Sequence, residues 1–114
     1  MEINQREIVI VNFKILPEGN QKHPCLIISS NEVQSNESFF IGVMLSSTTN
    51  EDDFTLWLND DDLTVPAKKK TQVRCHIINT FKKEDIIGKP VSKMKRKPFE
   101  KVLDKIFNYV IIND

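Results

Sequence analysis

Apolar side chains along this chain gather in five short runs, and polar segments separate the runs. Each run is rich in β-branched or aromatic residues, which pack well on a pleated sheet. Short runs of this kind at regular intervals favour the strands of one small barrel over a parallel sheet with crossover helices. The five expected strands are IVIVNF (8–13), CLIIS (25–29), FFIGVML (39–45), FTLWL (54–58) and QVRCHIINT (72–80).

The C-terminal segment has a different period, because its apolar residues recur at the spacing of one helical face. Pro98 suits the first turn of a helix, where its missing N–H would be unpaired anyway. The pattern predicts one amphipathic helix over 98–111 that packs on the barrel. Its apolar positions are Phe99, Val102, Leu103, Ile106 and Val110, and its wet positions are Glu100, Lys101, Asp104 and Lys105.

A shorter helical turn is expected over KKEDII (82–87), ended by Gly88. The whole pattern is that of a mostly β protein of the α+β class. We expect a small barrel of about five to seven strands with a C-terminal amphipathic helix, in a single domain over 1–114. Alternation within 72–80 also puts Cys75 and His76 on opposite faces of their strand.

Length and composition fit one globular domain. The chain has 114 residues, 39% of them hydrophobic and 28% charged, which is enough for a real core. No apolar run approaches the ~20 residues of a membrane span, and the polar start MEINQRE has no secretory signal. The two cysteines, Cys25 and Cys75, are therefore expected to be reduced thiols of a cytoplasmic protein.

The net charge of zero hides two halves of opposite sign. Residues 1–67 hold three bases and eleven acids, a net −8, whereas residues 68–114 hold thirteen bases and five acids, a net +8. A basic C-terminal half can meet phosphates or an acidic partner. Alternatively, the two halves neutralise each other across one surface, and charge counts alone do not decide between these readings.

Metal binding would need convergent ligands, which the pattern does not supply. The candidates are His23, Cys25, Cys75 and His76, but the last two diverge on their strand and no CxxC spacing is present. The acidic NDDD (59–62) lacks the glycine and the final glutamate of a calcium loop, so we expect a solvated turn. The chain also has no phosphate-binding glycine loop and no nucleophile elbow. We expect no metal and no cofactor.

Loop residues at the strand ends offer a different chemistry. Lys22 and His23 are expected at the end of the loop after the first strand, and Ser46, Ser47 and Thr48 follow the third strand. If these ends meet, an imidazole and a cation face a cluster of hydroxyls, the groups that transesterification of RNA needs. The alternative is an ordinary exposed histidine beside a serine-rich turn.

The order of these segments resembles that of the PemK/MazF family of type II toxins from about Glu7 to Val110. EIVIVNF (7–13) is similar to the family's first strand, with Arg6 where a glycine usually stands. EGNQKHPCLIISSNEV (18–33) is similar to its glycine-containing loop, Arg-Pro pair and apolar strand. GVMLSST (42–48) falls where the family has a strand that ends in a hydroxyl pair, and VRCHIINTFKKEDII (73–87) resembles its strand Gln-Ile-Arg-Thr-Ile-Asp-Lys-Arg-Leu.

The resemblance implies an SH3-like barrel that cuts single-stranded RNA without a metal, by attack of a 2′-hydroxyl. The family's catalytic arginine and its threonine or serine correspond to His23 and Ser46 here. Arginine stays charged and forks two donors onto a phosphate, whereas histidine is a switchable acid–base. His23 therefore takes over proton transfer beside Lys22, or the barrel has lost cleavage. The RNA-binding residues implied are Asn20, Gln21, Lys22, Ser47 and Thr48.

The partners implied are single-stranded RNA, an antitoxin with an acidic tail, and a second copy of the chain in a homodimer. The resemblance also implies a groove at the dimer interface that binds RNA or an antitoxin peptide. The basic second half of the chain suits either ligand. The competing function is a catalytically degenerate barrel that binds RNA or protein, including a role like that of a related barrel family that poisons gyrase.

Overall fold

The structure, a computed structural model, describes residues 2–13, 21–47 and 52–112. Within these ranges the chain forms six strands, two α-helices and three short helical turns. The elements are β1 (Glu7–Phe13), β2 (Gln21–Ile27), α1 (Asn31–Asn36), β3 (Phe39–Ser46), β4 (Thr55–Trp57), η1 (Asp60–Asp62), β5 (Gln72–Lys82), η2 (Lys83–Asp85), β6 (Ile86–Lys93), α2 (Arg96–Lys105) and η3 (Ile106–Ile111).

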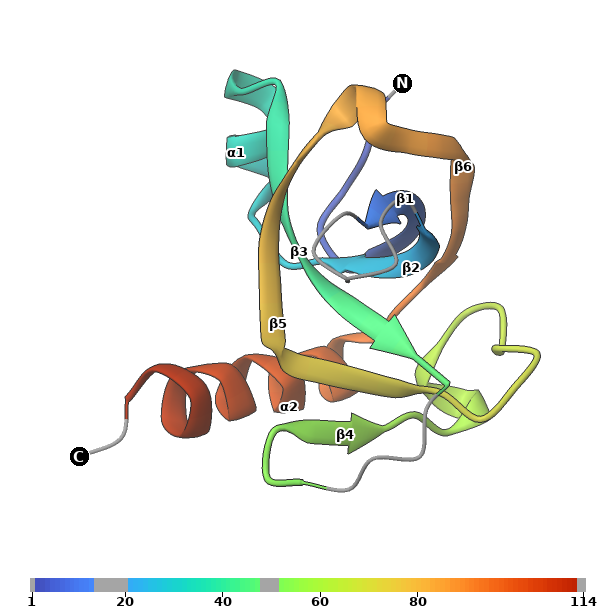
Figure 1. The fold of residues 1–114 in the computed structure, drawn as a ribbon, viewed down its shortest axis with the longest axis vertical. Coiled ribbons are helices and arrows are strands. Elements are labelled where there is room, and N and C mark those ends of the chain that lie inside the picture. The colour runs from blue at the N-terminus through green and yellow to red at the C-terminus, as the bar shows by residue number, and fades with distance from the viewer. Residues whose placement is uncertain (1, 14–20, 48–51, 113–114) are drawn as a thin grey trace.

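The six strands form one antiparallel sheet in the order β4-β5-β3-β2-β1-β6. Its two outer strands, β4 and β6, approach each other where a bridge joins Leu63 to Met94. Backbone hydrogen bonds support this junction, from Thr64 N to Lys93 O (2.8 Å) and from Lys95 N to Asp62 O (2.8 Å). The sheet therefore wraps into the expected barrel, with β1 and β2 inside the ring that the other strands trace in Figure 1.

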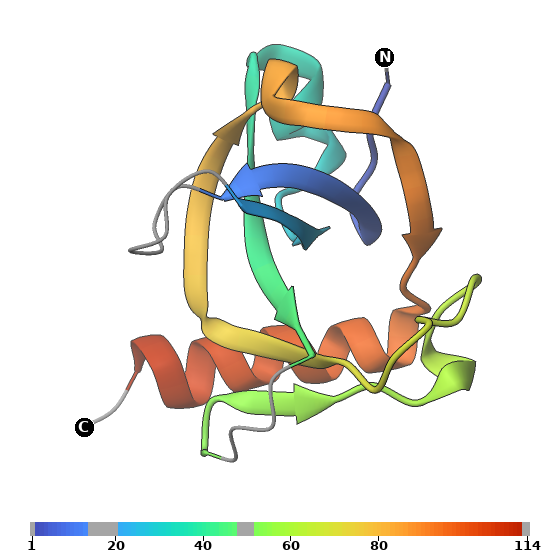
Figure 2. The same cartoon turned by 45° about the vertical axis from the view of Figure 1, so that its right-hand side comes forward.

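Two irregularities in strand pairing bend the sheet. Between the pairs Val43↔Ile78 and Met44↔Arg74, β5 holds extra residues that β3 does not match, and β5 turns sharply there (Figure 2). A similar shift lies between β1 and β6, where Gly88 has a φ of 77°. Extra residues on one strand bend and twist it, so these bulges supply the curvature that closes the barrel.

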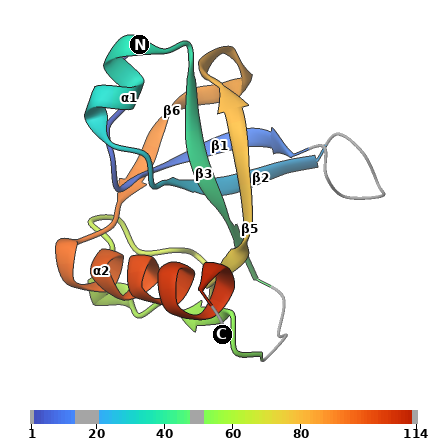
Figure 3. The same ribbon diagram turned by 90° about the vertical axis from the view of Figure 1, so that its left-hand side faces the viewer.

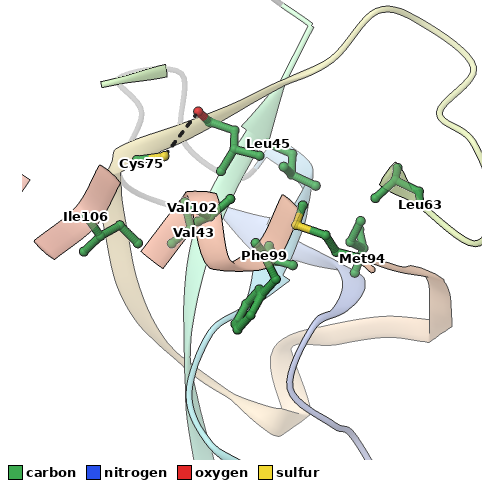
Figure 4. Close-up of a cluster of buried hydrophobic side chains, with 11 residues drawn as sticks. Val43, Leu45, Leu63, Cys75, Met94, Phe99, Val102 and Ile106 are labelled. Carbon is green, nitrogen blue, oxygen red and sulfur yellow. Dashed lines mark hydrogen bonds between the residues drawn. The ribbon is translucent and has the colours of Figure 1, made fainter. Parts of the chain in front are cut away.

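One core cluster fills the space between the sheet and α2. Figure 4 shows Phe99 and Val102 of α2, and Ile106 of η3, on the side of the helix that faces strand residues such as Val43 and Leu45. Leu103 and Val110 pack against the same cluster. The predicted C-terminal helix is therefore confirmed, with the predicted apolar face, and it runs across one end of the barrel (Figure 1).

A second cluster lies on the opposite face of the same strands. Val9 and Val11 of β1 meet Cys25 and Ile27 of β2 there, under the part of β5 that carries Phe81. The ring of Phe40 stacks on Phe81, with centroids 5.5 Å apart. Strands β1, β2 and β3 are thus buried on both faces, which explains why their sequences are nearly continuous apolar runs.

The structure adds two elements that the apolar pattern did not predict. Helix α1 occupies a segment interpreted as a polar turn; Ser30 caps its first turn, and Gln34 is buried against Ser29. Strand β6 begins at Ile86, so the expected helical turn shrinks to η2, and Gly88 lies within a strand instead of ending a helix. A strand interrupted by glycine and proline gives a weak periodic signal.

Arg6 stands where the similar family usually has glycine, and its φ of 78° lies in the left-handed region that glycine adopts without strain. Its guanidinium donates to Met94 O at 3.0 Å, which ties the start of β1 to the end of β6.

No helix among the described residues is long and apolar enough to cross a membrane.

Candidate functional site

The candidate site lies where β2 and β3 separate. Their ladder runs from Ile27↔Gly42 to Cys25↔Met44 and ends there. Beyond that pair the two strands diverge, and β2 continues toward its junction with β1 while β3 descends toward β4 (Figure 3). Continuing the register by two residues matches His23 with Ser46. The two residues therefore stand on the two arms of this divergence.

His23 belongs to a strand, which corrects the expectation that it ends a loop. It pairs with Val11 of β1, as Lys22 pairs with Asn12. The apolar pattern places the strand start at Cys25, after Pro24, which favours an extended start, but β2 begins at Gln21. A strand holds a side chain more firmly than a loop does, so the imidazole of His23 is better positioned than expected.

The two faces of the sheet decide which side chains can join this site. Paired residues in an antiparallel ladder share a face, and successive residues alternate. Val11, Cys25 and Met44 belong to the second cluster, so His23 and Ser46 lie on that same face, just past its apolar end. His23 is half-buried and Ser46 is buried, with 8% of its surface exposed.

Strand β5 adds two polar residues to this face. Gln72 pairs with Ser46 and is fully buried, and Arg74 pairs with Met44. The guanidinium of Arg74 donates to Oε1 of Gln72 at 3.3 Å and forms an ion pair with Asp52 at 3.5 Å. Its side chain is only 11% exposed, so its position is well defined. The site therefore combines an imidazole, a hydroxyl, an amide and a guanidinium on one face.

Asp52 links Arg74 to the turn that precedes β4. Its carboxylate accepts from the backbone N–H of Phe54 at 2.8 Å, and its backbone oxygen accepts from the hydroxyl of Thr55 at 3.3 Å. The pair also bears on the charge asymmetry. Within the described parts of the chain, Arg74–Asp52 is the one ion pair that joins the acidic half to the basic half. Most of the basic residues are therefore not neutralised by direct pairing across the halves.

Sequence reasoning missed Arg74 and Gln72 as members of the site. Alternation put Arg74 on the face opposite Cys75, which is correct, but it did not indicate which strand lies beside β5. The needed signal is the pairing of β5 with β3, a contact between residues far apart in the chain. Only that pairing brings Arg74 to the rim that holds Ser46.

The remaining expected site residues divide into described and undescribed ones. Lys22 and Ser47 are exposed at the ends of the two arms, beside His23 and Ser46. The backbone of Gln21 pairs with Phe13 at the start of β2. Asn20 and Thr48 lie outside the described residues. The described members thus stand on the two strand arms that diverge beyond the pair Cys25↔Met44.

The cysteines and His76 lie away from this rim. Cys25 and Cys75 are buried in different clusters, and no group of three or more His, Cys, Asp or Glu in the described part of the chain could hold a metal ion. Burial raises the pKa of the Cys75 thiol to about 12, and burial raises that of Cys25 as well. His76 is exposed at the bend of β5, with its ring 5.1 Å from that of Phe54. The predicted divergence of Cys75 and His76 is confirmed.

An apolar cavity of about 480 Å³ lies behind the candidate site. Its wall includes Pro24 and Leu45, the chain neighbours of His23 and Ser46, so it opens on the other face of the sheet. It shares none of the four polar side chains described above. The polar rim and the apolar cavity are therefore separate features.

Together these groups suit chemistry on an anionic ester. An imidazole can move a proton, and a hydroxyl and an amide can donate hydrogen bonds. A partly buried guanidinium can stabilise negative charge in a medium where electrostatic interactions are stronger than in water. A phosphodiester is one substrate class that can use all of these functions.

Comparison with known proteins identifies similar folds. The model of the PemK-like, MazF-like toxin of type II toxin–antitoxin systems matches residues 4–109. No curated protein matches the chain.

Solved structures of the same shape have little sequence in common with this chain. A MazF crystal structure from Deinococcus radiodurans superposes with a TM-score of 0.76 at 12% identity, covering 93% of this chain and 94% of the other. An endoribonuclease from a mycobacterial species, in complex with its cognate antitoxin, gives 0.75 at 14% identity over 91% and 90%. The Mycobacterium tuberculosis toxin MazF-mt6 gives 0.69 at 16% identity over 89% and 91%. These likenesses establish the fold.

Proposed function

Because the chain belongs to the PemK-like, MazF-like family of toxins of type II toxin–antitoxin systems, we propose that it is an endoribonuclease that cleaves single-stranded RNA. The observation that carries this proposal is the rim where β2 and β3 diverge. There His23 and Ser46 occupy facing arms, with Gln72 and Arg74 beside Ser46 on the same face. Two of the structurally similar proteins are mycobacterial endoribonucleases, which supports the same activity.

In the proposed reaction, the ribose 2′-oxygen attacks the adjacent phosphorus. His23 accepts the proton of the 2′-hydroxyl as the bond between the 2′-oxygen and phosphorus forms. The bond from phosphorus to the 5′-oxygen breaks, and the departing oxygen takes a proton from solvent. The products are a 2′,3′-cyclic phosphate and a 5′-hydroxyl. The attack itself consumes no water and needs no metal.

The other rim residues would stabilise the charge that develops on the phosphoryl oxygens. The hydroxyl of Ser46 can donate to one of these oxygens, and Lys22 supplies positive charge at the exposed edge. Arg74 is the guanidinium nearest to this position in the β3–β5 register. It restores, from a different strand, the charge that the family carries at the position of His23.

The deciding experiment measures cleavage of mixed-sequence single-stranded RNA in EDTA. The parent is expected to cut RNA to 2′,3′-cyclic phosphate ends and to leave single-stranded DNA intact, because DNA has no 2′-hydroxyl. His23→Ala is expected to lose about 10²- to 10⁴-fold in rate, the usual contribution of a positioned acid–base group. His23→Arg is expected to keep measurable cleavage, since it restores a charged fork at this position.

His76→Ala is the matched control, because it removes the only other histidine in the chain. His76 lies at the bend of β5 and is expected to be dispensable. If His76→Ala lost cleavage while His23→Ala kept full activity, proton transfer would depend on His76 and not on His23. Intact RNA with the folded parent would support the degenerate barrel that binds without cutting.

We also propose the partners that accompany this function. An antitoxin with an acidic tail fits the charge distribution, because thirteen of the sixteen bases fall in residues 68–114. The structure of a mycobacterial endoribonuclease with its cognate antitoxin supports this kind of partner. A homodimer is proposed from the family resemblance, and light scattering at several concentrations measures it directly.

A further inference from the structure

Trp57 has an unusual position for the only tryptophan in the chain. Its neighbours Leu56 and Leu58 pack against the cluster under α2. Because side chains alternate along a strand, the indole of Trp57 lies on the other face of β4. That side chain is half-buried, so a large aromatic group is kept partly accessible outside the main core.

The register of the sheet places Trp57 in the same transverse row as the candidate site. Trp57 pairs with Gln72, and Gln72 pairs with Ser46 on its other side. Paired residues share a face, so all three side chains lie on the face that carries the polar rim. Two strand spacings separate the backbone of Trp57 from that of Ser46, about 10 Å. That span is on the scale of one nucleotide.

A cationic side chain lies against this tryptophan. The ammonium of Lys70 lies 4.6 Å from the centre of the indole ring. An aromatic ring beside a cation is a combination that binds single-stranded nucleic acid, because a base stacks on the ring and a phosphate meets the charge.

We propose that Trp57 is a nucleobase-binding subsite, on which a base next to the cleaved phosphate stacks. Lys70 lies over one ring face and attracts the adjacent phosphate, and the base stacks on the opposite face. The subsite would position RNA along the row Ser46–Gln72–Trp57. The inference rests on the proposed function, because it assumes that the polar rim holds the phosphate.

The test separates stacking from cleavage by using probes that cannot be cut. One probe is a short fluorescein-labelled single-stranded oligodeoxyadenylate. The other is the same strand with one abasic position at its centre. Neither has a 2′-hydroxyl nucleophile, and fluorescence anisotropy gives the dissociation constant of each. The parent, Trp57→Ala and Trp57→Phe are compared with both probes, after circular dichroism has shown that each variant is folded.

Stacking predicts a coupling between the ring and the base. The complete strand should bind Trp57→Ala about tenfold more weakly than the parent, the change that roughly 1.4 kcal/mol of base–aromatic stacking produces. The abasic strand should bind the parent and Trp57→Ala alike, and Trp57→Phe should fall between them. Binding of the complete strand should also quench the tryptophan fluorescence of the parent, because Trp57 is the only tryptophan in the chain.

The chain offers a closely matched control at its other lysine–aromatic pair. The ammonium of Lys105 lies 4.3 Å from the ring centre of Tyr109, which is exposed at the end of the C-terminal helix. Tyr109→Ala removes an aromatic of similar surroundings outside the row, and it should leave both affinities unchanged. Lys70→Gln should weaken both probes equally, because a lysine beside a phosphate does not depend on the base.

Equal losses for the complete and abasic strands in Trp57→Ala would overturn the proposal, as would no measurable binding of either strand by the parent. A coupled loss without any RNA cleavage would retain the subsite and reject the endoribonuclease. RNA cleavage without this coupling would retain the endoribonuclease and reject the subsite.

Discussion

Two ends of one sheet face differ sharply in character. At one end, Val9, Cys25 and Met44 belong to a dry cluster; two residues further along β2 and β3, His23 and Ser46 form a polar rim. Strand alternation is the same at both ends, so alternation does not explain the difference. The apolar end is covered by the returning part of β5 with Phe81, whereas at the rim β2 and β3 diverge. A strand face becomes core or site according to what lies over it.

The comparison predicts different consequences for substitutions at the two ends. Substitutions at the rim should change RNA cleavage with little effect on stability. Substitutions at the apolar end should lower stability with little direct effect on cleavage. The cleavage loss expected for His23→Ala, described above, is the largest effect at the rim. The substitutions below test the boundary between the two ends in order of decreasing effect.

Arg74 lies at the boundary, and its replacement tests whether it serves substrate or structure. Arg74→Gln should lower RNA cleavage about 10²-fold, because a positioned donor for developing charge is lost. Asp52→Asn is the matched control, since it removes the same 3.5 Å ion pair and leaves the guanidinium in place. Steady-state cleavage and thermal melting are measured for both variants. Equal activity in the two would show that Arg74 only supports the turn before β4.

Gly42 tests the dry end, because it has no room for a side chain. A Cβ at this position would lie 2.1 Å from Sγ of Cys25, which is fully buried. Gly42→Ala should therefore destabilise the fold by about 1–3 kcal/mol, the usual cost of overpacking. Urea unfolding measures this change.

The double substitution sharpens the result. Cys25→Ala removes the clashing sulfur, so Gly42→Ala should cost clearly less in that background than in the parent. If the unfolding free-energy costs of Gly42→Ala and Cys25→Ala simply add, the strain arises elsewhere. Leu26 O and the ring of Phe40 are examples, because a Cβ would meet each at 3.4 Å.

The buried thiols predict a smaller, pH-dependent effect on the packed clusters. Burial raises the pKa of Cys75 from 9.0 to about 12. Between these values the unfolded thiol has lost its proton and the folded one keeps it, so the free energy of unfolding falls as pH rises through this window. The slope from one such group is at most about 1.4 kcal/mol per pH unit.

Urea unfolding between pH 8.5 and 10.5, compared with Cys75→Val, measures this contribution. The variant should show a shallower loss of stability, and alkylation of native parent thiols by iodoacetamide at neutral pH should be slow. Identical pH slopes for parent and variant would mean that Cys75 is not shielded in the native protein.

The sequence alone determined the elements whose periodicity is strong. The helical face of Phe99, Val102 and Ile106 and the apolar runs of β1 and β3 fix both their type and their buried sides, because burial of apolar area dominates their placement. The sequence pattern did not predict α1 and β6, because a short capped helix and a strand with Gly88 and Pro90 show little periodicity.

The sequence also placed the chemistry near His23 and Ser46, through the family pattern. Only the tertiary structure decided what surrounds them. The pairing of β3 with β5 brings Gln72 and Arg74 to Ser46, and the pairing of β4 with β5 brings Trp57 into the same row. These neighbours are distant in the chain, and a single sequence records side-chain type and period but not which strands lie side by side. The register of the sheet places the serine in a row of groups that we propose to hold one nucleotide.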